Sequence, residues 1–297
     1  MNCTYQTRGG KIYNSELFKE NTNFSALHDK GIAPRQSSTI QRNELGVINT
    51  PICTYYTHSL KKWTKWLLAL DSMEDQMDSW KNNLAQVKGT TEIQQSFAWK
   101  AFAWTPTKAE DIKPLQLVFS IFIDWFNPWG NKISGKQERL GVIILNCLNL
   151  PPLLHHKPAF LLLYSIIPGP NSPDVVTISN CLQSLVDELM ELKDGFTVLT
   201  AQNPEGRQVY LQVLPIRGDL LAIHKAVGFG SPAASKFCGW CDANLNELQL
   251  MKVGTKRTGY EILEAAKAWK NAKSLKAQED IRKETGIRWS ELNRLPY

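Results

Sequence analysis

The sequence predicts an α/β protein in which helices flank a mixed sheet. Three observations support this prediction. Short runs rich in Val, Ile, Leu and Phe recur between residues 115 and 216, which is the pattern of buried strands. One stretch among them repeats its apolar residues at spacings of three and four, as an amphipathic helix does. The hydrophobic fraction of 43% over 297 residues is enough for a substantial core.

The first 110 residues divide into two parts by composition. Residues 1–50 are rich in Asn, Thr, Ser and Gln, and we expect a loosely ordered N-terminal arm there. Residues 51–110 are predicted to be a helical segment, because apolar residues after Leu60 recur at helical spacing. The pattern fits one helix, or two helices broken near Asp71-Ser72 with the serine as cap of the second.

Three strands open the predicted core, which we place at residues 111–230. The first covers 115–123, where two of nine residues are polar, and the others cover 140–150 and 160–167. Prolines follow the second and third runs. Connections this short favour an antiparallel meander, because parallel strands need a longer crossover.

A helix and a hairpin complete the predicted core. Asp174 can cap a helix whose apolar stripe ends before Asp194-Gly195. Residues 196–199 and 209–216 then form a hairpin around a turn rich in Asn, Pro and Gly.

A carboxylate follows two of the predicted strands. Asp124 comes directly after the first, and Asp219 comes just after the strand at 209–216. Three strands, a helix and another strand is the order of a ribonuclease-H-like core, in which the first and fourth strands are neighbours and their terminal acids meet. Two divalent cations about 3.5–4 Å apart can then clamp a phosphodiester, and carboxylate oxygens suit Mg²⁺ or Mn²⁺. The ordinary role of such an Asp, a turn or helix cap, stays the alternative.

Two of the six cysteines, Cys238 and Cys241, are closely spaced. A Cys-x-x-Cys pair supplies half of a tetrahedral Zn²⁺ site, and His224 is one candidate for a further ligand. Inert cysteines and a redox pair are the alternatives. We expect residues 231–297, which contain the pair, to form a helical region after the core.

The sequence speaks against several classes of protein. No stretch reaches 18 apolar residues, so no membrane partner is expected. The first ten residues lack the apolar core of a secretion signal, and the cysteines do not form a disulfide framework. We therefore expect a protein of the nucleus or cytoplasm. No GxxxxGK[ST], GxGxxG, HExxH or GxSxG motif occurs. The net charge of +6 permits nucleic-acid binding without requiring it.

A resemblance to a known family rests on blocks that occur in one order along the chain. The stretch DWFNPWGNKISGKQERLGVIILNCLNLPP (124–152) resembles the catalytic-domain segment of CACTA-type (En/Spm-type) DNA transposases, in the branch common in fungal genomes. Six more blocks are similar to parts of that family: TYYTHSLKKWTKWLLAL (54–70), IIPGPNSP (166–173), LQSLVDELMEL (182–192), RGDLLAIHKAVGF (217–229), FCGWC (237–241) and RTGYEILEAAKAW (257–269). The segment GIRWSELNRLPY (286–297) completes the series.

The resemblance implies a ribonuclease-H-like nuclease with a metal-binding acidic triad, which cuts DNA at element ends and joins it to a target. It carries the first acid onto Asp124 and the second onto Asp219, although Leu221 replaces the family's Pro. It carries the Cys-x-x-Cys of an insertion after the second acid onto Cys238 and Cys241. The implied partners are transposon ends, target DNA and, in an oligomer, full-length relatives.

The resemblance also implies a departure from the family. Family members continue after a segment like that at 286–297 and supply a third acid, a Glu, and their N-terminal arm is longer. We therefore expect a truncated transposase-like protein that is inactive alone. The alternatives are a non-catalytic DNA-binding or interaction protein derived from a transposase, and a chain that does not fold stably.

Overall fold

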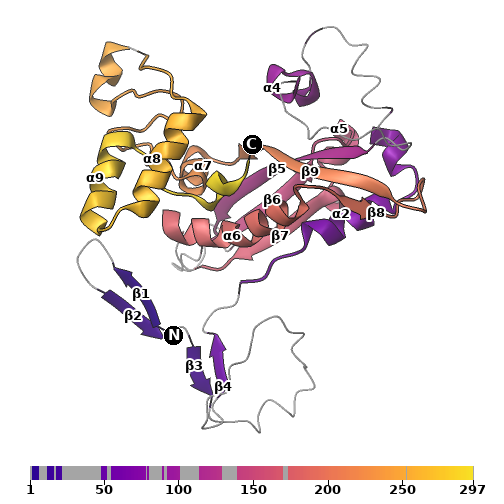
Figure 1. Ribbon diagram of the computed structural model, residues 1–297, viewed down its shortest axis with the longest axis horizontal. Coiled ribbons are helices and arrows are strands. Elements are labelled where there is room, and N and C mark those ends of the chain that lie inside the picture. The colour runs from indigo at the N-terminus through magenta and orange to yellow at the C-terminus, as the bar shows by residue number, and fades with distance from the viewer. Residues whose placement is uncertain are drawn as a thin grey trace. The chain divides into compact units, whose positions relative to one another are not determined.

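The computed structural model describes the following parts of the chain (Figure 1): residues 55–77, 79, 89, 92–100, 114–128, 139–169, 173–251 and 253–296, and four strands before residue 52. The chain divides into two compact units, Met1–Tyr55 and Tyr56–Tyr297. The domain limits predicted from composition stay a prediction.

Two antiparallel strand pairs occur in the first unit. Strand β1 (Asn2–Gln6) pairs with β2 (Ile12–Glu16), and β3 (Phe18–Asn21) pairs with β4 (Ile48–Pro51).

The core of the second unit is a five-stranded mixed sheet of order β7-β6-β5-β9-β8 (Figure 1). The central strand β5 (Leu115–Phe126) pairs antiparallel with β6 (Leu140–Cys147), which pairs antiparallel with β7 (Leu161–Ile167). On its other side β5 pairs in parallel with β9 (Arg207–Arg217), which is antiparallel to the short β8 (Phe196–Val198). The predicted meander, the hairpin and the pairing of the first strand with the later one are confirmed.

The helix predicted after the third strand is α6 (Val175–Leu192), and it lies across the sheet in Figure 1. The Asp174 carboxylate accepts a hydrogen bond from the Thr177 amide at 2.8 Å, so it caps the helix as predicted. The predicted stripe is buried: Ile178, Leu182, Leu185, Leu189 and Leu192. Burial of this stripe supplies most of the helix's stability.

The helical segment before the sheet is broken near Asp71-Ser72, as one of the two predicted alternatives has it. Helix α2 (Leu60–Leu68) ends in a turn, and residues 73–77 are helical again after Ser72, whose φ is +61°. The Trp63 ring of α2 contacts the Phe119 ring of β5 edge-on at 5.9 Å, which seats the helix on the sheet. The two-helix alternative is confirmed for the described residues. Two short helical pieces follow, η1 (Ile93–Gln95) and α4 (Phe97–Lys100).

Two strand limits differ from the prediction by three residues, and the others by two at most. The first strand was expected to end at residue 123, but β5 continues to Phe126 because β6 pairs with it as far as Leu140. Asp124 therefore lies within the strand instead of after it. The second strand ends at Cys147, because the side chain of Asn149 takes over the pairing with β5. Its Oδ1 accepts a hydrogen bond from the Val118 amide at 2.8 Å, and its Nδ2 donates to the Gln116 carbonyl at 3.0 Å.

Short helices make up most of the remaining secondary structure. Between β6 and β7 lie α5 (Pro152–His155) and η2 (Pro158–Phe160). After β9 come α7 (Leu220–Val227), η3 (Leu245–Leu250), α8 (Gly259–Asn271), α9 (Leu275–Thr285) and η4 (Glu291–Arg294). Figure 1 shows α8 and α9 side by side at one end of this unit. None of the helices in the described part of the chain has the length and apolar character needed to cross a bilayer.

The segment that carries α8 and α9 leaves and rejoins the core at one neck. The Gly230 amide donates to the Gly286 carbonyl and the Arg288 amide to the Gly228 carbonyl, each at 2.7 Å. Phe229 and Ile287 form an antiparallel bridge between them.

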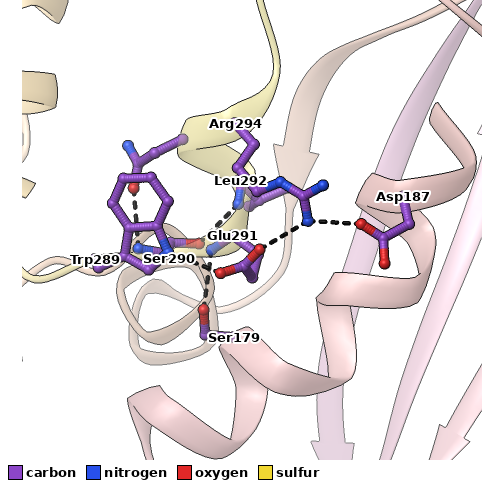
Figure 2. A network of polar contacts seen from close by, with 8 residues as sticks. Ser179, Asp187, Trp289, Ser290, Glu291, Leu292 and Arg294 are labelled. Carbon is purple, nitrogen blue, oxygen red and sulfur yellow. Dashed lines mark hydrogen bonds and ion pairs between the residues drawn. The ribbon is translucent and has the colours of Figure 1, made fainter. Parts of the chain in front are cut away.

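Beyond the neck, η4 is fastened to α6 by a polar network (Figure 2). The Glu291 amide donates to the Ser179 hydroxyl at 2.9 Å, and Arg294 forms ion pairs with Asp187 at 2.6 Å and Glu291 at 3.0 Å. The buried Ser290 hydroxyl donates to the Ala226 carbonyl of α7 at 2.5 Å. The end of the described chain is thus fixed to both α6 and α7.

Candidate functional site

The parallel pairing of β5 with β9 brings the two predicted acids to one edge of the sheet. Phe122 is in register with Arg217, so two residues further on Asp124 of β5 comes level with Asp219 after β9. The backbones are in contact here, because a Cβ on Gly218 would stand 2.3 Å from the Ile123 carbonyl oxygen.

A bulge in β9 sets this register. Phe119 pairs with Val213 and Ile121 with Ile216, so Leu214 and Pro215 together stand opposite one residue of β5. Proline has no amide hydrogen for the ladder, which is why a bulge accommodates it. The bulge shifts the end of β9 by one residue and thereby decides that Arg217 and Asp219 come level with Phe122 and Asp124.

Asp124 is half-buried within β5, opposite Val142 of β6. Its Oδ1 accepts a hydrogen bond from the Trp125 amide at 2.7 Å. A carboxylate held this way on a rigid central strand has a fixed position, as a metal ligand needs.

Asp219 is exposed and caps the N-terminus of α7. Its Oδ1 accepts a hydrogen bond from the Ala222 amide at 2.6 Å, and the backbone of Asp219 is extended as an N-cap requires. Asp219 therefore has the role of a helix cap, which was the alternative to a metal ligand. The capping hydrogen bond uses one of its two carboxylate oxygens.

Lys225 lies near Asp219 and over the Trp125 ring, and the sequence did not predict it. Its ammonium donates to the Pro173 carbonyl at 3.1 Å and stands 5.7 Å from the centre of the ring of Trp125, the residue after Asp124 in β5. Burial and the charge of Arg139 lower the pKa of Lys225, while the nearby carboxylates, including Asp219, raise it. Lys225 thus links the helix that Asp219 caps to the strand that carries Asp124. The signal was weak, because a lysine near a helix C-terminus is commonplace.

The donor set at this edge fits a magnesium-type ion in part. Mg²⁺ is commonly held by one or two carboxylates together with water and substrate oxygens. Among the residues that the structure describes, no three His, Cys, Asp or Glu side chains gather closely enough to hold a metal ion. Among the described residues, the carboxylates at this edge of the sheet are therefore those of Asp124 and Asp219.

Cys238 and Cys241 lie on a turn that pairs with the chain at Lys256. The Trp240 amide donates to the Cys238 sulfur at 3.4 Å, and Cys241 forms an antiparallel bridge with Lys256. Burial alone would raise the pKa of Cys238, but hydrogen bonds from Trp240 and Cys241, with the charge of Arg257, bring it below the usual value. Both cysteines are free thiols. A thiol with a lowered pKa is a better metal ligand, because the thiolate is the binding form.

His224, the candidate for a further zinc ligand, is a core residue. It is 5% exposed, its Nδ1 lies 2.6 Å from the Gly230 carbonyl oxygen, and its ring meets the Phe229 ring edge-on at 5.8 Å. His224 is therefore a buried histidine with its own hydrogen-bond partner, which is the usual role of a lone histidine.

Comparison with known proteins identifies the family. A search among curated proteins found no match. The family described as "Transposase family tnp2" matches residues 91–284. That range is well over half of the chain and contains the sheet, both acids and both cysteines of the Cys-x-x-Cys pair. The chain therefore belongs to the transposase family tnp2.

Proposed function

We propose that this protein provides a metal-dependent DNA-cleaving core of the cut-and-paste type, in which Asp124 and Asp219 hold Mg²⁺ or Mn²⁺. The observation that carries the proposal is the parallel β5–β9 pairing, which brings these two carboxylates to one edge of the sheet. Membership of a transposase family supports DNA as the substrate. The resemblance to CACTA-type transposases supports transposon ends and target DNA as the DNA substrates.

The order of the elements supports a ribonuclease-H-like core. Strands β5, β6 and β7, helix α6 and strand β9 follow one another, and β5 lies between β6 and β9. Strand β8 is additional to this order; it is a short edge strand that pairs antiparallel with β9. In this arrangement the end of the first strand and the end of the fourth are neighbours, as the chemistry requires.

The chain's own residues would position the ion and the DNA. The Trp125 amide orients the Asp124 carboxylate, and the Ala222 amide orients that of Asp219. When bound, the metal would supply charge stabilisation to the oxygens of the phosphodiester and would activate water. Sites of this class draw on a third acid, and small displacements of ligands cost about a hundredfold in rate. Since the part of the chain that the structure describes gathers no third such ligand, we propose weak cleavage by this core.

The proposal is tested by nicking of supercoiled plasmid DNA in Mn²⁺. Asp124→Ala should abolish nicking, because it removes a ligand from the central strand. Asp219→Asn should also abolish it while keeping the thermal transition, since Asn caps a helix about as well as Asp. The matched control is Asp75→Asn, an exposed carboxylate after α2, which should nick like the wild type. Nicking that survives both site substitutions would overturn the assignment.

A second candidate is a non-catalytic DNA-binding protein derived from a transposase. The observation that favours it is the cap formed by Asp219, which gives this acid a structural role without any metal. In that case the wild type would show no Mn²⁺-dependent nicking above the Asp124→Ala background, although it would bind DNA.

We also propose that Cys238 and Cys241 form half of a Zn²⁺ site. The hydrogen bond from the Trp240 amide to the Cys238 sulfur and the lowered pKa of that thiol support the proposal. Two thiolates need two more ligands for a tetrahedral site.

A further inference from the structure

We propose that Trp240 is a stacking platform for an unpaired DNA base, held at a fixed distance from the acid pair. Its side chain is 84% exposed, although Trp is on average among the well-buried residue types. The inference rests on the proposed function in taking DNA as the ligand. Base stacking on aromatic rings is the usual way in which proteins bind single strands without sequence preference.

The backbone that displays Trp240 is held on both sides. The Trp240 amide donates to the Cys238 sulfur at 3.4 Å, and the Trp240 carbonyl accepts from the Arg257 amide at 2.9 Å. The guanidinium of Arg257 donates to the Cys241 carbonyl at 2.9 Å and to the Thr285 carbonyl at 2.7 Å. A ring on a backbone fixed in this way can bind without paying for loop ordering.

The same turn rests on the helix that begins at the acid pair. A Cβ on Gly239 would stand 2.6 Å from the Phe229 ring, so the turn lies directly on that ring. Phe229 follows the C-terminal cap of α7, and Asp219 is the N-cap of the same helix. Eight helical residues span about 12 Å. That length is on the order of three or four base steps along one strand, so the two sites can contact one DNA strand.

The charges around the indole suit DNA. The turn and the segment bridged to it, 236–242 and 255–258, contain three cations and one carboxylate, and the Glu261 carboxylate also lies near Arg257. Oδ1 of Asp242, the carboxylate within these segments, accepts a hydrogen bond from the Thr255 amide at 2.6 Å. Lys256, paired with Cys241 across the bridge, is exposed. Cations next to an exposed aromatic ring bind the phosphate of the nucleotide whose base stacks on it.

A protein partner is the competing explanation, because further apolar side chains are exposed nearby on and after η3: Leu248, Leu250, Met251 and Val253. Trp240 is separated from them along the chain, and the segment bridged to its turn carries the exposed Lys256, which favours a nucleotide. The experiment below distinguishes the two ligands.

The test is the affinity of the full chain for a fluorescent single-stranded oligothymidylate, measured by anisotropy without metal. Trp240→Ala should weaken binding by about 5- to 150-fold, the range expected for one stacked base, and Trp240→Phe should retain most of the affinity. The matched control is Tyr56→Ala, a 76% exposed aromatic before α2, which should leave binding unchanged. The thermal transition should be unchanged in all three variants, because both rings are exposed.

Three outcomes would overturn the proposal. These are a change of less than twofold in Trp240→Ala, equal losses in the Ala and Phe variants, and a change in oligomeric state of Trp240→Ala without a change in DNA affinity. The test is independent of cleavage. Loss of oligonucleotide binding in Trp240→Ala, with no Mn²⁺-dependent nicking by the wild type, would support stacking and contradict the catalytic proposal. If nicking is lost in Asp124→Ala and oligonucleotide binding does not change in Trp240→Ala, the catalytic proposal is supported and the stacking proposal is contradicted.

Discussion

Cysteine 238 and cysteine 147 show how strongly position decides the chemistry of one residue type. Cys147 is fully buried at the end of β6, and burial raises its pKa to about 12. Cys238 lies on the turn that displays Trp240, and its pKa is below the usual value. Since the thiolate is the reactive and metal-binding form, the two thiols should differ widely in reactivity.

This difference gives a prediction for the proposed zinc half-site. In the native protein at neutral pH, a small alkylating reagent should modify Cys238 well before Cys147, and Zn²⁺ should slow labelling of Cys238 and Cys241. Mass spectrometry of peptides from timed samples measures both rates. Cys147 is the internal control, because it should become reactive when the protein is unfolded in urea. Labelling of Cys238 that is indifferent to Zn²⁺ would contradict the half-site.

Other features of the site at this scale could not be predicted from the sequence. Asp124 and Asp219 were recognisable because each stands near the end of an apolar run. Lys225 was not, because its contact with the Trp125 ring depends on how α7 lies against β5. The environment of Trp240 was hidden for the same reason, since Arg257, which holds it, is distant in sequence.

Between elements, the closest approach at the site is that of Gly218 to β5. A methyl group there would stand 2.3 Å from a backbone oxygen of Ile123, and backbone cannot move aside without parting the two strands. Gly218→Ala should therefore destabilise the protein by about 2 kcal/mol or more, in the range of overpacking and strain, and should abolish nicking.

The matched control for this prediction is Gly259→Ala at the first residue of α8. A Cβ there meets nothing within 4 Å, so that variant should be as stable as the wild type or more stable by up to about 1 kcal/mol. Urea denaturation of the three proteins measures the difference. Equal stability of the two variants would show that the strands do not meet as described.

The elements that the sequence predicted well are those with a local signal. Helix α6 was predictable because its stripe, its Asp174 cap and its terminal glycine all agree. The extension of β5 to Phe126, and the bulge at Pro215, depend instead on partner strands. Pairing of that kind leaves little trace in the residues themselves.

For the whole molecule, the net charge of +6 bears on how DNA would be bound. Binding carried by phosphate contacts releases counterions, so affinity should fall linearly as log salt rises. We expect filter binding of duplex DNA to weaken between low and moderate salt. Asp124→Asn should bind at least as well as the wild type, because it removes a negative charge near the phosphates.

The same variant, tested for both filter binding and nicking, separates the catalytic from the non-catalytic proposal. If the protein cleaves DNA, Asp124→Asn keeps its affinity and loses Mn²⁺-dependent nicking. If it only binds, the substitution changes neither property. Affinity that does not depend on salt would contradict binding through phosphate contacts.

The neck at Gly230 and Gly286 gives residues 231–285 a particular freedom in evolution. The chain leaves and re-enters the core at neighbouring positions, which two backbone hydrogen bonds join. Doubling the length of such a closed loop costs only about 0.6 kcal/mol of closure entropy. The segment can thus gain or lose whole helices, and acquire new contacts with DNA, while the register that aligns the two acids stays the same.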